Sequence, residues 1–360
     1  MSREDKRSVG RALRQYARQF IAAIFAGALS IGIMGSASAQ EVVRVGHFSW
    51  PGYGFFYVAQ AQKLAPNLKF EFTVIEDPVQ LFSLLATNQL DVVLSTIEFG
   101  PIAAAEKMPL KLVSLTNLGY GSDHIIVHPD IKSPEQLKGE RIAVLEGGLS
   151  QIYMAIWLEQ QGIKWDEVEM VNLIAGDAAA AMISGQIAAA ELWDPFGAQV
   201  LAELKGSREL SHSREPQWLK SALIADAVFM SDDFLQNKRS VAVETTKAMF
   251  AGVEWWRTNA TAANDIIANA VGFSVEDVRL ILGGENNPED GTLYMYSLEE
   301  AAKFCGETPG DPPFGQHNGQ MKDHWELTNK WWINFKLMDR TIDSASGVDC
   351  ALIGAAHSGG

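Results

Sequence analysis

Stretches with the period of a strand alternate with stretches of helical period along residues 42–116, and no other feature constrains the fold as strongly. Apolar and polar side chains alternate at residues 42–48 (VVRVGHF) and again at 69–75 (KFEFTVI). Residues 89–95 (QLDVVLS) are typical of a buried strand. Helical spacing separates these strands, and this order predicts a mainly parallel sheet covered by helices.

A second set of strands and helices begins after the glycine-rich link at residues 119–123 (GYGSD). Strands are expected at HIIVHP, RIAVLE and VEMVNLI, with helices between them. Residues 222–230 (ALIADAVFM) then look like a strand that crosses back. Helices are expected afterwards at 241–258, 260–271, 275–282 and 298–305, and residues 206–216 are expected to form an exposed loop.

This order predicts an α/β protein with two lobes, each built on a parallel-rich sheet flanked by helices. Residues 40–120 would form the first part of lobe 1, 121–224 would form lobe 2, and 225–360 would complete lobe 1 with a helical tail. Two crossings between discontinuous lobes make a hinge, and the cleft between hinged lobes is a usual place for a small ligand.

The N-terminal residues have the composition of a secretory signal peptide. Basic residues precede an apolar run at 20–35, and Ala37-Ser38-Ala39 offers small side chains for cleavage. The run is shorter than the roughly 20 residues that a bilayer-spanning helix needs. We therefore expect residues 1–39 to be removed and the protein to be exported.

Charge and motif content argue against several classes of protein. The formal net charge of −15 disfavours binding to a phosphate backbone, so no nucleic acid partner is expected. The chain has no phosphate loop and no Gly-x-Ser-x-Gly elbow. We expect no enzyme activity, no metal and no cofactor.

The two cysteines, Cys305 and Cys350, permit one disulfide in an oxidising compartment. Such a bond would tie the C-terminal tail back to the chain near Pro309. The alternative is two unpaired, partly buried thiols.

Several stretches, in their order along the chain, resemble one family. They are the signal peptide, VRVGHFSWPGYGFFYVAQ, QLFSLLATNQLDVVLSTIEFGP, GSDHIIVHPDIKSPEQLKGERIAVLEGGLSQ and GDAAAAMISGQIAAAELWDPF. Together they resemble the substrate-binding proteins of ABC importers, in the group that binds nitrate, sulfonates, taurine and thiamine precursors. The WPGY turn is similar to binding proteins of urea-carboxylase systems. The resemblance implies a monomeric periplasmic protein with the type II periplasmic binding fold, which delivers a small molecule to a membrane permease.

The resemblance also implies which turns line the cleft. Carried over position by position, the implied ligand-binding residues are Trp50, Tyr53, Ser95, Thr96, Glu98, Asn117, Asp123, Gly148, Ser150, Trp193 and Asp194. One departure is visible, because Ala188 stands where the family usually has aspartate.

The residue types in these turns favour a nitrogenous solute. The turns contain acidic side chains and no lysine or arginine, whereas a sulfonate or nitrate site more often uses a basic group. An aromatic face gains roughly 0.5–2 kcal/mol from a cation above it. We therefore expect a small organic nitrogen compound, cationic or neutral.

Other interpretations stay open at this point. Backbone amides at the EGGLSQ turn, with Ser150 as a cap, could hold a sulfonate, taurine or nitrate without a basic side chain. Trp50 and Tyr53 could instead pack a lobe edge, and Asp194 could be a structural cap. A receptor that serves a sensor would use the same cleft. Thiamine pyrimidine synthases resemble this architecture, but their cysteine-rich motif is missing from a chain with two cysteines.

Overall fold

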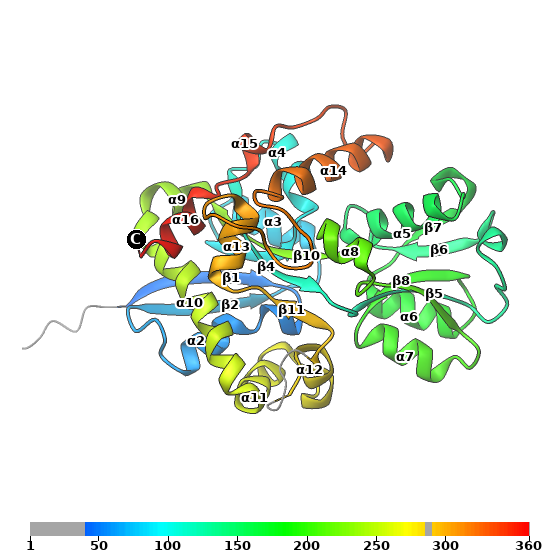
Figure 1. Cartoon of the computed structure of the whole chain (residues 1–360), viewed down its shortest axis with the longest axis horizontal. Coiled ribbons are helices and arrows are strands. Elements are labelled where there is room, and N and C mark those ends of the chain that lie inside the picture. The colour runs from blue at the N-terminus through cyan, green and yellow to red at the C-terminus, as the bar shows by residue number, and fades with distance from the viewer. Residues whose placement is uncertain (1–39, 285–289, 360) are drawn as a thin grey trace, which may run out of the picture. The chain divides into compact units, whose positions relative to one another are not determined.

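A computed structural model describes residues 40–284 and 290–359, whose strands form two sheets. The first sheet contains β1 (Glu41–His47), β2 (Leu68–Val74), β3 (Val92–Thr96), β4 (Leu110–Gly119), β10 (Ala225–Ser231) and β11 (Leu293–Met295). The second contains β5 (Asp123–Val127), β6 (Arg141–Val144), β7 (Glu169–Asn172), β8 (Ala189–Trp193) and β9 (Arg208–His212). Figure 1 shows the two sheets with their helices.

Each sheet is mixed, because β10 and β11 in the first sheet and β5 in the second run opposite to the other strands. The first sheet has the order β11-β4-β10-β3-β1-β2, and the second has the order β7-β6-β8-β5-β9. In the first sheet β10 runs antiparallel to both β3 and β4, and in the second β5 runs antiparallel to both β8 and β9. β5 and β10 are the strands that follow the two crossings, so each enters its sheet from the opposite end. The parallel arrangement expected from the sequence therefore holds for β2-β1-β3 and β7-β6-β8.

Helices follow most strands. In chain order they are η1 (Pro51–Tyr53), α2 (Phe55–Ala61), α3 (Pro78–Ala86), α4 (Phe99–Ala105), η2 (Pro134–Leu137), α5 (Leu149–Gln160), η3 (Trp165–Glu167), α6 (Ala175–Ile183), α7 (Phe196–Glu203), α8 (Pro216–Ser221), α9 (Asp232–Asn237), α10 (Arg239–Thr258), α11 (Ala260–Val271), α12 (Val275–Leu282), α13 (Leu298–Cys305), α14 (Met321–Asn334), α15 (Ser344–Gly347) and α16 (Ala351–His357). The four C-terminal helices expected from apolar spacing correspond to α10–α13, which confirms those expectations.

Alternating side chains of the second sheet face two different layers of helices. Ile125 and Val144 pack with α5, whereas Ile126 and Leu192 pack with α6 and α7. This alternation is the two-residue period of a strand with both faces covered. The alternation also determines which side chains near the strand ends lie on the face of the sheet that packs against α5.

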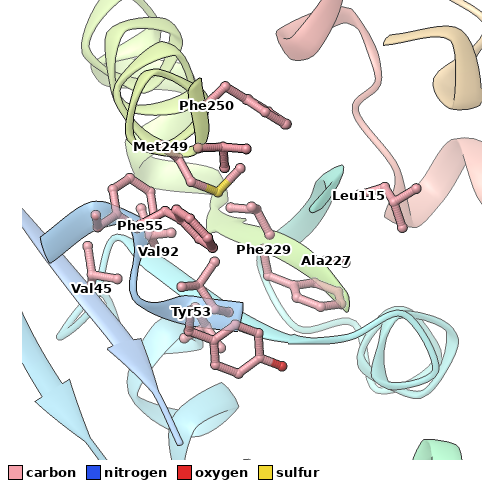
Figure 2. Close-up of a cluster of buried hydrophobic side chains, with 14 of the residues drawn as sticks. Val45, Tyr53, Phe55, Val92, Leu115, Ala227, Phe229, Met249 and Phe250 are labelled. Atoms are coloured by element: carbon pink, nitrogen blue, oxygen red, sulfur yellow. The ribbon is translucent and has the colours of Figure 1, made fainter. Parts of the chain in front are cut away.

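The first sheet carries the larger apolar core. Figure 2 shows part of it, where Phe55 and Met249 come from helices and Val92 and Phe229 come from neighbouring strands. Tyr53 lies at the edge of this cluster, and its ring is 1% exposed. Because the ring is anchored in the core, the turn that contains it has a defined position.

Two connections join the sheets, from β4 to β5 and from β9 through α8 to β10. Gly119 lies in the first connection. A Cβ atom at this position would lie 2.5 Å from Ile224 Cγ2 and 2.6 Å from Asp123 Oδ2. Glycine is therefore needed for the two connections to pass each other closely. The lobe boundaries at residues 120 and 224 stay a prediction.

The C-terminal tail does not pack on the first sheet alone. Trp331 and Trp332 of α14 are buried in the same apolar cluster as Ile125 and Leu158, which belong to the second sheet and to α5. Helix α14 also packs against α4. The tail therefore contacts the surroundings of both sheets, which its sequence does not indicate.

Residues 206–216 contain a strand and do not form the expected exposed loop. β9 pairs with β5, and its Ser211 is 1% exposed. The hydroxyl oxygen of Ser211 lies 3.0 Å from Trp218 Nε1, which donates a hydrogen bond to it. This edge strand is mostly polar, so its sequence lacks the apolar alternation that predicts a strand.

A disulfide joins Cys305 to Cys350, as one of the two interpretations of the sequence expected. It connects the end of α13 to the start of α16. The expected signal peptide, residues 1–39, lies outside the described residues. Within the described ranges no helix has both the length and the apolar character needed to cross a membrane.

Candidate functional site

A cavity of about 120 Å³ opens between the strand ends of the two sheets. Most of its wall is apolar, with a few polar side chains among the rings and aliphatic groups. The wall consists of Phe48, Trp50, Glu76, Pro78, Thr96, Phe99, Asn117, Gly119, Ser122, Asp123, Leu145, Gly148, Leu149, Ser150, Leu173, Ile174, Ala175, Glu191, Trp193, Ile224, Asp226 and Leu293. An apolar pocket with few polar groups is the usual form of a small-molecule site.

The Trp-Pro-Gly-Tyr turn builds one side of this cavity. Pro51 begins η1, a position where the missing N–H of proline is tolerated. A Cβ atom at Gly52 would lie 2.6 Å from Trp50 Nε1 and 2.9 Å from Asn117 Nδ2. The turn therefore needs glycine, because any side chain there would displace the indole of Trp50.

Asp226 of β10 holds both aromatic residues of the turn. Trp50 Nε1 donates to Asp226 Oδ2 at 2.9 Å, and the Tyr53 hydroxyl donates to Asp226 Oδ1 at 3.0 Å. Asp226 is 8% exposed, and burial raises the pKa of its carboxyl to about 7. One buried carboxyl group thus positions the indole and also faces the cavity.

Three polar residues lie side by side on neighbouring strands at this end of the first sheet. Asp226 pairs with Thr96 of β3 on one side and with Asn117 of β4 on the other. The buried hydroxyl of Thr96 has no hydrogen-bond partner among the described residues. This row offers a solute both donors and acceptors.

The second sheet contributes two further buried carboxyl groups. Asp123 on β5 lies opposite Trp193 on β8, and Glu191 is two residues before Trp193, so the three side chains share a face. Burial raises the pKa of Asp123 to about 6, although Ser122 donates a hydroxyl to it. Burial also raises the pKa of Glu191 well above its usual value.

Two tryptophan rings close the cavity from opposite sheets. The ring centroids of Trp50 and Trp193 lie 5.1 Å apart in an edge-to-face arrangement. Trp193 also contacts Phe196 at 4.8 Å. Aromatic surfaces from both sheets thus enclose the same space.

The start of α5 reaches the cavity through Gly148, Leu149 and Ser150. Gly148 is the N-cap residue, and no side chain caps the helix. The Ser150 hydroxyl accepts a hydrogen bond from the Leu145 N–H at 2.7 Å and therefore closes the preceding turn. The expectation that Ser150 caps the helix is therefore wrong.

Seven of the residues implied by the resemblance line the cavity together. They are Trp50, Thr96, Asn117, Asp123, Gly148, Ser150 and Trp193. Tyr53, Ser95, Glu98 and Asp194 do not line it. Tyr53 supports Asp226 from behind, and Ser95 points to the opposite face of β3 from Thr96 because strand side chains alternate.

Glu98 turns away from the cavity and toward α14. Its Oε1 lies 2.9 Å from His324 Nε2, and both side chains are fully buried. Trp332 Nε1 donates to the Glu98 carbonyl oxygen at 2.8 Å. The structure thus gives Glu98 a packing partner 226 residues away in sequence.

Asp194 lies beside the cavity, where Thr292 Oγ1, next to β11 of the first sheet, donates to its Oδ2 at 3.4 Å. Its Oδ1 lies 3.1 Å from His124 Nε2 and accepts from the Ala198 N–H near the start of α7. His124 Nδ1 lies 2.5 Å from Glu209 Oε1. Burial alone would lower the pKa of His124, but these two carboxylates raise it to about 10.

Sequence reasoning missed Asp226, which sits within the apolar stretch ALIADAVFM. A lone acidic residue in a buried strand was the available signal, since buried carboxyl groups need partners. Phe48, Glu76 and Ile174 also line the cavity without having been singled out. Among the described residues no cluster of histidine, cysteine and acidic groups could hold a metal ion.

Comparisons with known proteins bear on this arrangement. A model of the NMT1-like family matches residues 106–272. A protein of Brucella abortus named as a binding protein is 29% identical over 136 residues, which cover 37% of this chain and 42% of that protein. An aliphatic sulfonates-binding protein of Escherichia coli is 27% identical over 194 residues, 52% of this chain and 60% of the relative. The taurine-binding periplasmic protein of Escherichia coli is 30% identical over 148 residues, which cover 41% of this chain and 45% of that protein.

Solved structures extend the likeness to nearly the whole chain. The periplasmic aliphatic sulphonate-binding protein SsuA from Escherichia coli superposes with a TM-score of 0.64 at 16% identity, over 86% of this chain and 92% of that one. Part of the sequence is similar to sulfonate- and taurine-binding proteins, and the fold matches that of SsuA. This confirms the resemblance and the two-lobed α/β periplasmic binding fold expected from the sequence.

The sequence similarity to these binding proteins covers only part of their length. The chain spans about half the length of the curated relatives that it matches. At 16% identity the structural likeness shows the fold. The desulfurization enzyme DSZB shares that fold, with a TM-score of 0.59 at 13% identity over 89% of this chain and 99% of that one. The chemistry of the cavity must therefore be argued from its own residues.

Proposed function

We propose that the chain is the solute-binding component of an ABC importer, which encloses a small organic molecule and delivers it to a membrane permease. One observation carries the proposal, namely the cavity whose aromatic walls come from both sheets. A hinged pair of lobes can open and close around such a space. An engineered apolar cavity of roughly 150 Å³ binds benzene, so about 120 Å³ suits a solute of that size or smaller.

The proposed place of action is the periplasm, where the protein would act as a monomer. The signal peptide expected at residues 1–39, the disulfide and the periplasmic relatives support this location. The permease would be the protein partner. No role in nucleic acid binding is proposed, because the net charge of −15 opposes it.

Binding without catalysis is the function that the cavity supports best. Its wall, as the described residues form it, contains no cysteine, histidine, lysine or arginine. The side chains on it therefore offer no pairing of a nucleophile with an imidazole or amine base. The matched relatives are also named as binding proteins.

Two solute classes remain, and different observations favour them. The names of the relatives favour a sulfonate or taurine. The wall favours an organic nitrogen compound, since it carries Asp123, Glu191 and Asp226 and no basic side chain. A unit charge about 4 Å from a carboxylate interacts by roughly 4 kcal/mol at an effective dielectric constant of 20, so the sign of the solute charge matters.

A thermal-shift screen of the purified protein tests the proposal. The compounds are amines, amidines, pyrimidines, sulfonates, taurine, nitrate and amino acids. A ligand at one hundred times its dissociation constant stabilises the native state by about 2.7 kcal/mol, so a hit is readily measured. We expect Trp50→Ala to weaken binding of the hit about tenfold, because the indole forms the cavity wall.

Trp255→Ala is the matched control, since Trp255 of α10 is only partly buried and lies outside the cavity wall. It should bind the hit as the unmodified protein does. Trp50→Phe keeps an aromatic wall if Trp50→Ala folds poorly. A screen in which no class of compound raises the melting temperature would contradict the proposed function.

A further inference from the structure

Three buried carboxyl groups in the cavity wall have no basic side chain beside them there. Asp123, Glu191 and Asp226 are 6%, 5% and 8% exposed. Glu76 adds a fourth, more exposed carboxyl group at the wall. Because a buried charge without a partner is unfavourable, this arrangement needs either bound protons or a positively charged guest.

Among these carboxyl groups, Glu191 has a buried oxygen whose hydrogen-bonding capacity is unsatisfied by the described residues. Its Oε1 is buried and has no hydrogen-bond partner within the described part of the chain. Asp226 already accepts from Trp50 and Tyr53, and Asp123 accepts from Ser122. The free acceptor of Glu191 lies on the same face of the second sheet as Asp123 and Trp193. A buried group without a partner in a cavity wall indicates where a guest atom belongs.

The nearby cations are already engaged elsewhere. His124, which neighbours Asp123, lies between the carboxylates of Asp194 and Glu209. Arg214 donates to the carbonyl oxygens of Tyr120 and Gly291 and lies over the Tyr120 ring. Neither residue lines the cavity. The positive charge of His124 is more than balanced by its two partners, so the cavity retains an excess of acidic groups.

We propose, building on the proposed function, that the solute presents a positively charged N–H group, an ammonium or amidinium, to Glu191 and Asp123. Its apolar part then lies against Trp50 and Trp193. The charged N–H group supplies the donor that Glu191 Oε1 lacks and neutralises the paired acids. The aromatic rings accommodate the remainder of the solute and attract a cation at their faces.

The same chemistry could come from a simple cation or from a zwitterion. The N–H groups at the start of α5 lie at the wall, and they could hold the acidic end of an aminosulfonate while its ammonium contacts Glu191. A purely anionic sulfonate would leave Glu191 and Asp123 without a counter-charge. The inference therefore concerns the positive group and is independent of whether a negative one accompanies it.

Calorimetry with matched compounds at pH 7.5 tests the inference on the purified protein. The sets are acetamidinium, acetamide and acetate; benzamidinium, benzamide and benzoate; and taurine with ethanesulfonate. We expect at least one cation or taurine to bind at least tenfold more tightly than its neutral and anionic counterparts. Taurine alone as the hit would identify a zwitterion, and an amidinium alone would identify a simple cation.

Glu191→Gln removes one charge and keeps the shape of the side chain. We expect it to weaken binding of the positively charged compound at least tenfold and to change binding of the neutral counterpart less than threefold. Glu146→Gln is the matched control, because Glu146 lies on the neighbouring turn, is exposed and does not line the cavity. It should leave both affinities within twofold. Equal losses for charged and neutral compounds would mean that Glu191 acts only in packing, which overturns the assignment.

The outcomes separate this inference from the function on which it rests. If ethanesulfonate binds as tightly as taurine, or anions bind better than cations, the inference fails while the solute-binding function stands. If a broader sulfonate screen gives a hit whose affinity is unchanged in Glu191→Gln, the same conclusion follows. If no compound of any charge binds, the proposed function fails as well.

Discussion

Glu98→Ala should lower the free energy of unfolding by about 3 kcal/mol, because it leaves a fully buried imidazole without its hydrogen-bond partner. Glu98 Oε1 lies 2.9 Å from His324 Nε2, and neither side chain is exposed. Among the described atoms, Glu98 Oε2 and His324 Nδ1 have no further partner, so the pair has no alternative contact to replace the one that is lost. The measurement is urea unfolding at pH 7 of the purified protein.

Glu106→Ala is the matched control for Glu98→Ala. Glu106 follows the last turn of the same helix, α4, but is exposed. Its replacement should change the free energy of unfolding by less than about 0.5 kcal/mol. In the double variant Glu98→Ala/His324→Ala the two effects should be less than additive, because each replacement removes the same contact.

Ligand binding by Glu98→Ala also distinguishes two interpretations of Glu98. Its place after the DVVLS strand implies a cavity residue, whereas the structure directs its side chain to α14. We therefore expect the affinity for a screened solute to change less than threefold once the protein is folded. A variant that is as stable as the unmodified protein but no longer binds would contradict the structural role.

Asp226→Asn should raise the free energy of unfolding of the ligand-free protein at pH 8 by about 2 kcal/mol. Burial raises the pKa of Asp226 from 3.8 to about 7, which corresponds to about 4 kcal/mol of stability lost on ionisation. Asparagine has no charge to desolvate. Asp226→Asn therefore avoids that loss of stability. It also exchanges one acceptor oxygen beside Trp50 and Tyr53 for an amide nitrogen, which costs about 2 kcal/mol, so the net increase in stability is about 2 kcal/mol.

The pH dependence gives the sign of this effect. The native state binds the Asp226 proton more tightly than the unfolded chain does, so the stability contribution is fully present below about pH 4. It declines as the pH rises from about 4 to about 7. The unmodified protein should therefore lose stability between pH 5 and pH 8, and Asp226→Asn should lose less.

Urea unfolding at pH 5 and pH 8 measures that difference. Asp265→Asn in α11 is the control, since Asp265 is exposed and should alter stability by less than about 0.5 kcal/mol at either pH. Asp123, whose pKa is raised to about 6, leaves part of the decline in place in Asp226→Asn. If both proteins show the same change from pH 5 to pH 8, the burial of Asp226 does not destabilise its charged form.

Local chemistry explains why much of the fold could be predicted. Helices α12 (Val275–Leu282) and α13 (Leu298–Cys305) follow Ser274 and Ser297, whose side chains cap them, and apolar residues recur at helical spacing within each. Strand β9 was missed because its polar residues lack an apolar period and its existence depends on pairing with β5. Segments whose stability comes from nearby residues are readable from a sequence, and segments stabilised by distant partners are not.

The candidate site divides in the same way. The Trp-Pro-Gly-Tyr turn could be placed at the cavity because proline, glycine and the preceding strand act within a few residues of one another. Asp226 could not, because its contact with Trp50 spans 176 residues. Glu98 was assigned to the cavity for the same reason, since its partner His324 lies far along the chain.

The order of residues alone determined the alternation of strands and helices, the two crossings and the acidic, aromatic character of the turns, because these depend on short-range periodicity and on side-chain type. Only the tertiary structure decided which carboxyl groups face the cavity and which face a packing partner. Side-chain direction depends on strand register and on the approach of distant segments such as α14. Burial by those segments, and not the identity of the acidic residues, separates Glu191 in the wall from Glu98 in the core.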